Sequence, residues 1–150
     1  MPNVIVLKGD PLRREGLAGG SVTPGDLASI DSNNKIVRHA TAGGNALPLF
    51  AVEMDLIGSG IDDVYPSGAT VKLVASRTGD GIYALLASGQ NVAVGAFLES
   101  AGNGALEAYT QQSGSNVFPA AVVAIATEAV DNSSGGSAHN GAARIKVEVI

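Results

Sequence analysis

Two stretches of this sequence follow the same plan of turns and apolar segments. Residues 22–37 and residues 92–107 each begin with a valine and a glycine-containing turn, then run through apolar residues to a second turn. That second turn is Ser32-Asn33-Asn34 in the first stretch and Gly102-Asn103-Gly104 in the second, and a short strand follows each. Strand–turn–strand units of one plan predict an all-β fold, a compact β-barrel or sandwich with pseudo-repeated halves.

Further patterns in the sequence support strands rather than helices. Asn103-Gly104 is the clearest hairpin signal, because both residues readily adopt the positive φ of a tight turn. Residues 70–75 and 143–150 alternate between apolar and polar side chains, as half-buried strands do. Residues 118–130 are rich in alanine, but their valines and isoleucine favour a long strand. We expect a polar loop at residues 111–116.

Composition limits the classes of protein that this chain can belong to. Its 150 residues suffice for one domain with a hydrophobic core, and its 20 glycines lack the period of a fibre. The absence of cysteine excludes disulfides, thiolate metal sites and cysteine nucleophiles. A net charge of -5 argues against a broad nucleic-acid-binding surface.

The apolar runs are too short for a signal peptide or a membrane span. We therefore expect a soluble protein that is made in the cytoplasm and binds neither membrane nor nucleic acid.

The N-terminal residues differ from the rest of the chain. We interpret residues 1–16 as an extended arm and residues 17–150 as a single β domain, because glycine and proline interrupt the arm. The arm could pair with the sheet edge of a neighbouring subunit, or it could be a loose terminus. Its apolar run and basic side chains favour docking, and the candidate contact residues are Val4, Ile5, Val6, Leu7, Lys8, Arg13 and Arg14.

Residues that could carry chemistry are few. The two histidines, His39 and His139, fall in a strand and in a Ser/Gly/Asn loop at residues 131–141 that we expect to be mobile, so a shared site is disfavoured. Asp62 and Asp63 lack the alternating oxygen donors of a calcium loop, and a solvated turn is the simpler interpretation.

Three other patterns also favour structure over catalysis. Residues 77–81 lack the lysine of a phosphate-binding loop and are read as a hairpin turn, and residues 58–60 do not form a nucleophile elbow. Glu53 and Asp55 would share one face of a strand, which is compatible with acid–base chemistry but is more often a surface acidic patch. We therefore predict no catalytic residue, no metal and no cofactor.

Several stretches, in this order and spacing, resemble the capsid decoration (cement) proteins of tailed bacteriophages. The resemblance covers roughly residues 17–150 and is carried by residues 22–27, 38–44, 50–55, 89–95, 128–131 and 143–149. It implies a compact β-tulip-like domain on the capsid exterior that clamps neighbouring subunits of the major capsid protein.

The resemblance also implies the partners and the location of this chain. The partners would be the major capsid protein and further copies of the chain itself, and the protein would reside in the virion. A trimer is favoured over a dimer. Two other classes remain open, a small oligomeric β-barrel enzyme and a carbohydrate- or receptor-binding module. The enzyme would need a cluster of titratable groups in a cleft. A sugar-binding surface usually offers aromatic platforms, and three scattered tyrosines do not suggest one.

Overall fold

The computed structural model describes residues 2–111 and 120–150, and most of its strands fall into two groups. The first group contains β2 (Leu12–Leu17), β3 (Ala28–Ile30), β4 (Ile36–Arg38), β5 (Leu49–Ala51) and β6 (Thr70–Ala75). The second contains β7 (Gly81–Leu86), β9 (Phe97–Ser100), β10 (Leu106–Ala108), β11 (Val122–Ala126) and β13 (Ala143–Val149). The remaining elements are β1 (Val6–Lys8), β8 (Asn91–Val92), β12 (Val130–Asp131) and the short 3-10 turns η1 (Asp55–Ile57) and η2 (His139–Gly141).

The second group closes into a five-stranded barrel. Its strands follow the order β7-β10-β9-β11-β13, and β13 pairs again with β7, from Ala143 opposite Leu86 to Glu148 opposite Gly81. A parallel contact between Leu106 and Leu86 joins β10 to β7. Closure leaves these five strands with few unpaired edges.

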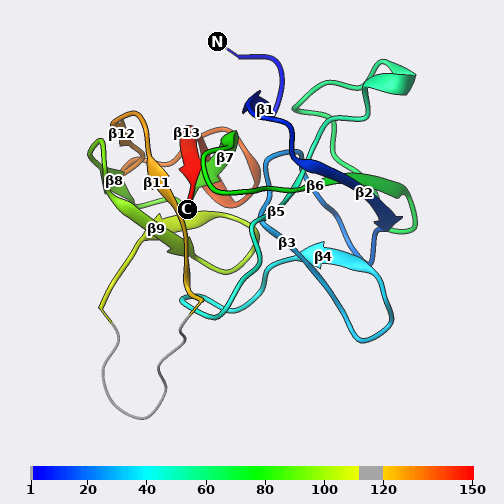
Figure 1. The fold of residues 1–150 in the computed structure, drawn as a ribbon, viewed down its shortest axis with the longest axis horizontal. Helices are drawn as coiled ribbons and strands as arrows, with labels where there is room; N and C mark the ends of the chain where they lie inside the picture. Colours follow the sequence, from blue (N-terminus) through cyan, green and yellow to red (C-terminus); the bar gives the residue numbers. More distant parts are fainter. Residues whose placement is uncertain (1, 112–119) are drawn as a thin grey trace.

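The first group forms a smaller closed ring of strands, which we call the first barrel; the ring formed by the second group is the second barrel. β2, β6 and β5 form an antiparallel sheet, and β3 and β4 form a hairpin. Single bridges complete the ring, one from Leu27 to Phe50 and a parallel one from Ala18 to Ile36. Figure 1 shows the two groups side by side, with β9 and β11 on the left and β2 and β4 on the right.

The predicted repeat is visible in the main-chain hydrogen bonds. The N–H of Asp31 donates to Lys35 O at 2.9 Å, and 70 residues further along Ala101 donates to Ala105 O at 2.9 Å. Other bonds recur at the same spacing, His39 to Leu27 and Tyr109 to Phe97, Asp26 to Thr23 and Ala96 to Ala93. The turns use left-handed asparagines, Asn34 with φ 59° and Asn103 with φ 60°. The all-β prediction with repeated strand–turn–strand halves is confirmed.

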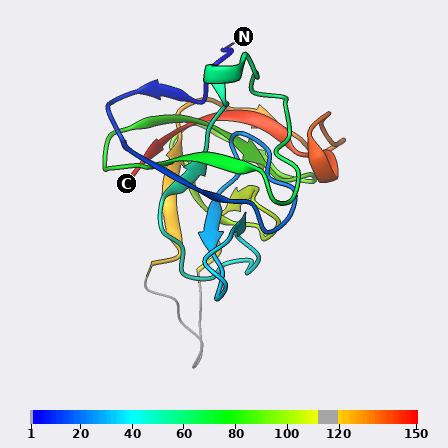
Figure 2. The ribbon, with the colours of Figure 1, turned by 90° about the vertical axis from the view of Figure 1, so that its right-hand side faces the viewer.

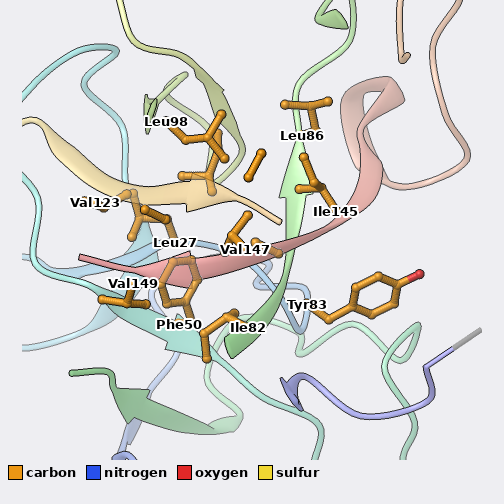
Figure 3. Close-up of a cluster of buried hydrophobic side chains, with 14 of the residues drawn as sticks. Leu27, Phe50, Ile82, Tyr83, Leu86, Leu98, Val123, Ile145, Val147 and Val149 are labelled. Carbon is orange, nitrogen blue, oxygen red and sulfur yellow. The ribbon is translucent and has the colours of Figure 1, made fainter. Parts of the chain in front are cut away.

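The main hydrophobic core fills the second barrel and the junction between the barrels. Alternate residues of β13, namely Ile145, Val147 and Val149, are fully or almost fully buried there. Figure 3 shows Leu27 and Phe50 of the first group within the same cluster. Each such side chain contributes about 1.5–3 kcal/mol through burial. Because the barrels share side chains, they pack as one body.

The N-terminal residues are paired within the chain, unlike the extended arm expected for residues 1–16. In β1, Val6 lies opposite Ile82 of β7, and β2 pairs with all six residues of β6 across the expected boundary at residue 16. The chain turns between these strands at Gly9, where φ is 94°. The glycine and proline residues that interrupt this segment therefore mark a bend between two paired strands. The sequence did not show this pairing, because the partner strands β6 and β7 lie more than 50 residues further along the chain.

The loop at residues 131–141, expected to be mobile, is anchored. The buried Asn132 side chain donates to the carbonyls of Leu86, Ala87 and Gly141, each at 3.0 Å. Three main-chain acceptors hold one amide group, so the loop is fixed to the end of β7. The loop expected at residues 111–116 lies, apart from Gln111, outside the described residues.

Candidate functional site

The apolar part of the expected contact segment is largely committed to the fold. Ile5 is fully buried, its N–H donates to Glu53 Oε2 at 3.1 Å, and its carbonyl accepts the Tyr83 N–H at 2.7 Å. Val6 and Leu7 are half-buried. Among residues 4–8, the exposed side chains are those of Val4, which is 43% exposed, and of Lys8.

The basic part of the segment, by contrast, is open. Arg13 and Arg14 lie on β2, where five of the six residues are exposed. The exposed set includes Leu12 and Leu17, at 59% and 47%. No ion pair involves Arg13, Arg14 or Glu15 in the part of the chain that the structure describes. β2 thus presents a strand of mixed apolar and charged side chains to the surroundings.

A buried carboxylate, Asp26, joins three distant segments. Its Oδ2 accepts the Thr23 N–H at 2.7 Å and Arg38 Nε at 2.9 Å, and its Oδ1 lies 2.7 Å from His139 Nε2. Asp26 is fully buried, and Arg38 also donates through Nη2 to Thr23 Oγ1 at 3.1 Å. Each carboxylate oxygen therefore has a partner, and solvent does not reach them.

Two glycines make room for this arrangement. Gly25 turns the chain with φ 98°, and Gly104 faces the carboxylate, where a Cβ would lie 2.5 Å from Asp26 Oδ1. The sequence shows the turn at residues 24–26 but gives no local signal for His139, which is 113 residues away. Because the carboxylate is saturated and inaccessible, we assign it a structural role.

The other histidine belongs to a separate clamp. His39 Nε2 lies 2.9 Å from Asn45 O and Nδ1 lies 2.7 Å from Ser100 Oγ. Since a carbonyl only accepts, Nε2 carries the proton and Nδ1 accepts from the serine hydroxyl, which in turn accepts the Gly102 N–H at 3.1 Å. Ser100 is fully buried, so this serine–histidine pair cannot reach a substrate. The two histidines bond different partners, and neither is part of a shared site.

The carboxylates of Glu53 and Asp55 have separate tasks. Glu53 accepts the Ile5 N–H, whereas Asp55 Oδ1 lies 2.7 Å from Lys72 Nζ. The hydrogen bond from Lys72, followed by its charge, lowers the pKa of Asp55 below its ordinary value. A carboxylate with a lowered pKa is a poor general base, and the acid–base interpretation gains no support.

The remaining sequence candidates form ordinary turns. Asp63 Oδ2 accepts the Gly60 N–H at 2.6 Å, and Asp62, 91% exposed at its side chain, lies 3.3 Å from Arg144 Nη2. Asp80 Oδ2 accepts the Arg77 N–H at 2.8 Å in the tight connection between β6 and β7. These contacts account for the aspartates without a ligand.

One pair of acidic residues was not singled out from the sequence. Glu99 and Glu107 lie directly opposite each other on β9 and β10, and Glu99 is only 4% exposed. Burial, followed by the charge of Glu99, raises the pKa of Glu107. Counting outward from the three-residue turn Gly102-Asn103-Gly104 places the two glutamates opposite each other, so the length of this turn was the available signal.

Two pockets of the described residues are open to solvent and mainly apolar. One of about 360 Å³ lies beside η1 and is lined by Met54, Ile57, Val64, Tyr65 and Ala69 among others. Another of about 350 Å³ lies beside the β3–β4 hairpin, with Ile30, Leu47 and Leu49 in its wall. The second pocket is also lined by His39, Ser29 and Thr41, but both ring nitrogens of His39 are already bonded, to Ser100 Oγ and Asn45 O.

Within residues 2–111 and 120–150 no cluster of three His, Asp or Glu side chains could hold a metal ion. The same residues include no helix with the length and hydropathy needed to cross a membrane. Searches of protein-family models and of curated proteins give no match to this sequence.

Proposed function

We propose that this protein decorates the exterior of a phage capsid, where it binds the major capsid protein and stabilises contacts between its subunits. The proposal rests on the resemblance of residues 17–150 to capsid decoration proteins. The structural observation that supports it most directly is the exposure of Lys8 at the end of β1, and of Arg13 and Arg14 on β2, in a chain with 14 acidic and 9 basic residues.

The body of the molecule suits a protein that reinforces a lattice. Two strand circuits packed through one core resist deformation, because closely packed interiors transmit strain. Polar side chains such as those of Asp26, His39 and Asn132 are used to fasten segments to one another. We propose three-fold self-assembly on the capsid, with a two-fold dimer as the alternative.

The proposed capsid contact combines a small apolar area with positive charge. Val4 would lose its exposed 43%, a part of the roughly 1.5–3 kcal/mol that full burial of such a side chain provides. Lys8 would add about 0–1 kcal/mol against an acidic capsid side chain, and less at high salt. Contacts of this size have a large total effect only when repeated over a shell.

The test first asks whether a major capsid protein is encoded beside this gene, and then measures binding to capsid shells assembled from that protein. We expect saturable binding at a fixed ratio, visible by co-sedimentation and by electron cryomicroscopy, and greater heat resistance of the decorated shells. The double variant V4D/K8E should bind about tenfold more weakly, equivalent to about 1.4 kcal/mol. K35E, the same charge change on the β3–β4 turn, is the matched control.

Point substitutions are preferable to truncation, because removing residues 2–16 would also remove Ile5 from the core and β2 from its sheet. Absence of saturable wild-type binding would overturn the proposed function. Undiminished binding by V4D/K8E would overturn the proposed contact surface.

A further inference from the structure

The two barrels differ at one sheet edge. In the second barrel β1 covers the beginning of β7, where the Tyr83 N–H donates to Ile5 O at 2.7 Å and Val6 lies opposite Ile82. In the first barrel β2 corresponds to β7. β7 ends at a parallel contact with β10, the second strand of the β9–β10 hairpin, and β2 ends at a parallel contact with β4, the second strand of the β3–β4 hairpin. No strand of the described chain pairs with β2 along the edge that faces away from β6, the edge that corresponds to the one covered by β1 on β7.

The alternation of hydrogen bonds identifies the groups on the open edge. The Ala18 N–H bonds to Ala69 O at 2.8 Å, as part of the ladder with β6. Because successive residues of a strand direct their main-chain groups to opposite sides, the N–H and C=O of Arg13 and Glu15 point away from β6. The edge ends after Leu17, where the Gly19 N–H bonds to Ile36 O at 2.8 Å.

β2 is also poorly covered by side-chain packing. Five of its six residues are exposed, and Arg13 and Glu15 form no ion pair within the part of the chain that the structure describes. An edge strand with free main-chain groups is a template for pairing with another chain. In the second barrel the corresponding edge is already filled by β1.

We propose that this edge pairs with β2 of a second copy of the chain, antiparallel about a two-fold axis at Arg14. In this register Arg13 lies opposite Glu15 of the second copy, and Glu15 lies opposite Arg13. Each opposed pair exchanges two main-chain hydrogen bonds, and the sheet continues from β5 of one copy to β5 of the other. The contact is isologous, since both copies use the same residues.

Charge selects this register over its neighbours. Main-chain bonding requires that outward-facing residues oppose each other, so a two-fold axis passes through a residue rather than between two. An axis at Glu15 would oppose two glutamates, and an axis at Arg13 would oppose two arginines, both of which are unfavourable. Only the axis at Arg14 opposes Arg13 and Glu15 twice. This register therefore forms two opposite-charge pairs between Arg13 and Glu15 against one like-charge pair at Arg14, and this balance identifies a second copy as the occupant.

The same register places the two Arg14 side chains opposite each other on the other face of the sheet. Their repulsion weakens the dimer, so the variant R14T should tighten it. The proposal concerns the isolated protein and does not depend on binding to a capsid. Three-fold assembly through another surface is compatible with it, and β2 would then join two trimers.

The experiment is a charge exchange followed by analytical ultracentrifugation from about 1 μM to 1 mM, a range that covers weak dimers. The variants R13E and E15R each oppose like charges and should weaken association at least tenfold. The double variant R13E/E15R restores opposite charges and should associate like the wild type. An equimolar mixture of R13E and E15R should form a mixed dimer, because their charges are complementary.

Amide hydrogen exchange gives a second measurement in the wild type. Exchange at Arg13 and Glu15 should slow as protein concentration rises, while exchange at Asn33, on an exposed turn, should not change. Unaltered circular dichroism of each variant verifies folding, which the exposure of both side chains leads us to expect.

Three results would overturn the proposal. They are a wild type that shows no two-fold association at about 1 mM, single variants that associate as the wild type does, and a double variant or mixture that fails to recover association. If the protein is a trimer through another surface, the single variants should halve the mass of the wild-type particle, and an unchanged mass would refute the pairing.

Discussion

Replacing Asp26 with asparagine tests the claim that one carboxylate fastens three segments of the fold. The substitution keeps the shape of the side chain but removes its charge. The amide can still accept from Thr23 and Arg38 through one oxygen, yet it offers Nδ2 in place of the second acceptor. Arg38, whose side chain is only 19% exposed, then loses its counter-ion.

The expected loss follows from the burial of the pair. Removing one partner of a buried ion pair costs about 3–5 kcal/mol, because the other charge stays desolvated. Arg38 keeps some solvent exposure and its bond to Thr23 Oγ1, so we expect D26N to lower the free energy of unfolding by about 2–4 kcal/mol. For a chain of this length that corresponds to a fall in Tm of about 5–15 °C.

The assay is urea unfolding at neutral pH, followed by circular dichroism, with D62N as the matched control. Asp62 has the same chemistry in a surface pair with Arg144, and its loss should cost at most about 1 kcal/mol. A double-mutant cycle with R38Q should give a coupling above about 1 kcal/mol. If D26N and D62N destabilise the protein equally, Asp26 is not the fastening group described above.

Three further changes have defined outcomes. I5A should lower the free energy of unfolding by about 2–5 kcal/mol, while V4A should cost much less, because Ile5 is fully buried and Val4 is half-exposed; equal effects in denaturant unfolding would contradict the placement of β1. G104A should be far more destabilising than G89A, since both glycines have positive φ but only Gly104 would clash, with Asp26; similar Tm values would refute this. E107Q should stabilise the protein by about 0.2–1 kcal/mol at neutral pH by relieving repulsion from Glu99. The raised pKa of Glu107 means that the folded state binds its proton more readily, so the wild type loses stability as pH rises from the ordinary carboxyl pKa to the raised one; an E107Q advantage that is unchanged at pH about 4 would contradict this assignment.

Features determined by neighbouring residues were predictable from the sequence. Asn34 and Asn103 adopt the left-handed conformation that closes their hairpins, because asparagine tolerates it better than most residues. The alternation in residues 70–75 and 143–150 predicted β6 and β13, since one face of each strand must be apolar. The correspondence between residues 22–37 and 92–107 predicted two hairpins of the same design.

Features that depend on distant partners were not predictable in this way. Ile5 looked like part of an exposed apolar arm, and only the position of β7 and Glu53 makes it a core residue. The loop containing His139 has the composition of a mobile segment, yet Asp26 holds it from the other half of the chain. No spacing rule relates residues more than 100 positions apart, so these contacts emerge only from the assembled fold.

The inequality of the two barrels has a consequence for how the chain folds. A sequence with two similar halves risks pairing a strand of one half with the wrong partner in the other, which would trap a misfolded intermediate. Here corresponding positions carry different volumes, with Ala18 and Ala28 in the first half where the second has Leu86 and Leu98. A second-half strand placed in the smaller barrel would be overpacked, at a cost of about 1–3 kcal/mol. The difference in side-chain size at these two positions therefore disfavours a fold in which a strand of one half lies in the barrel of the other.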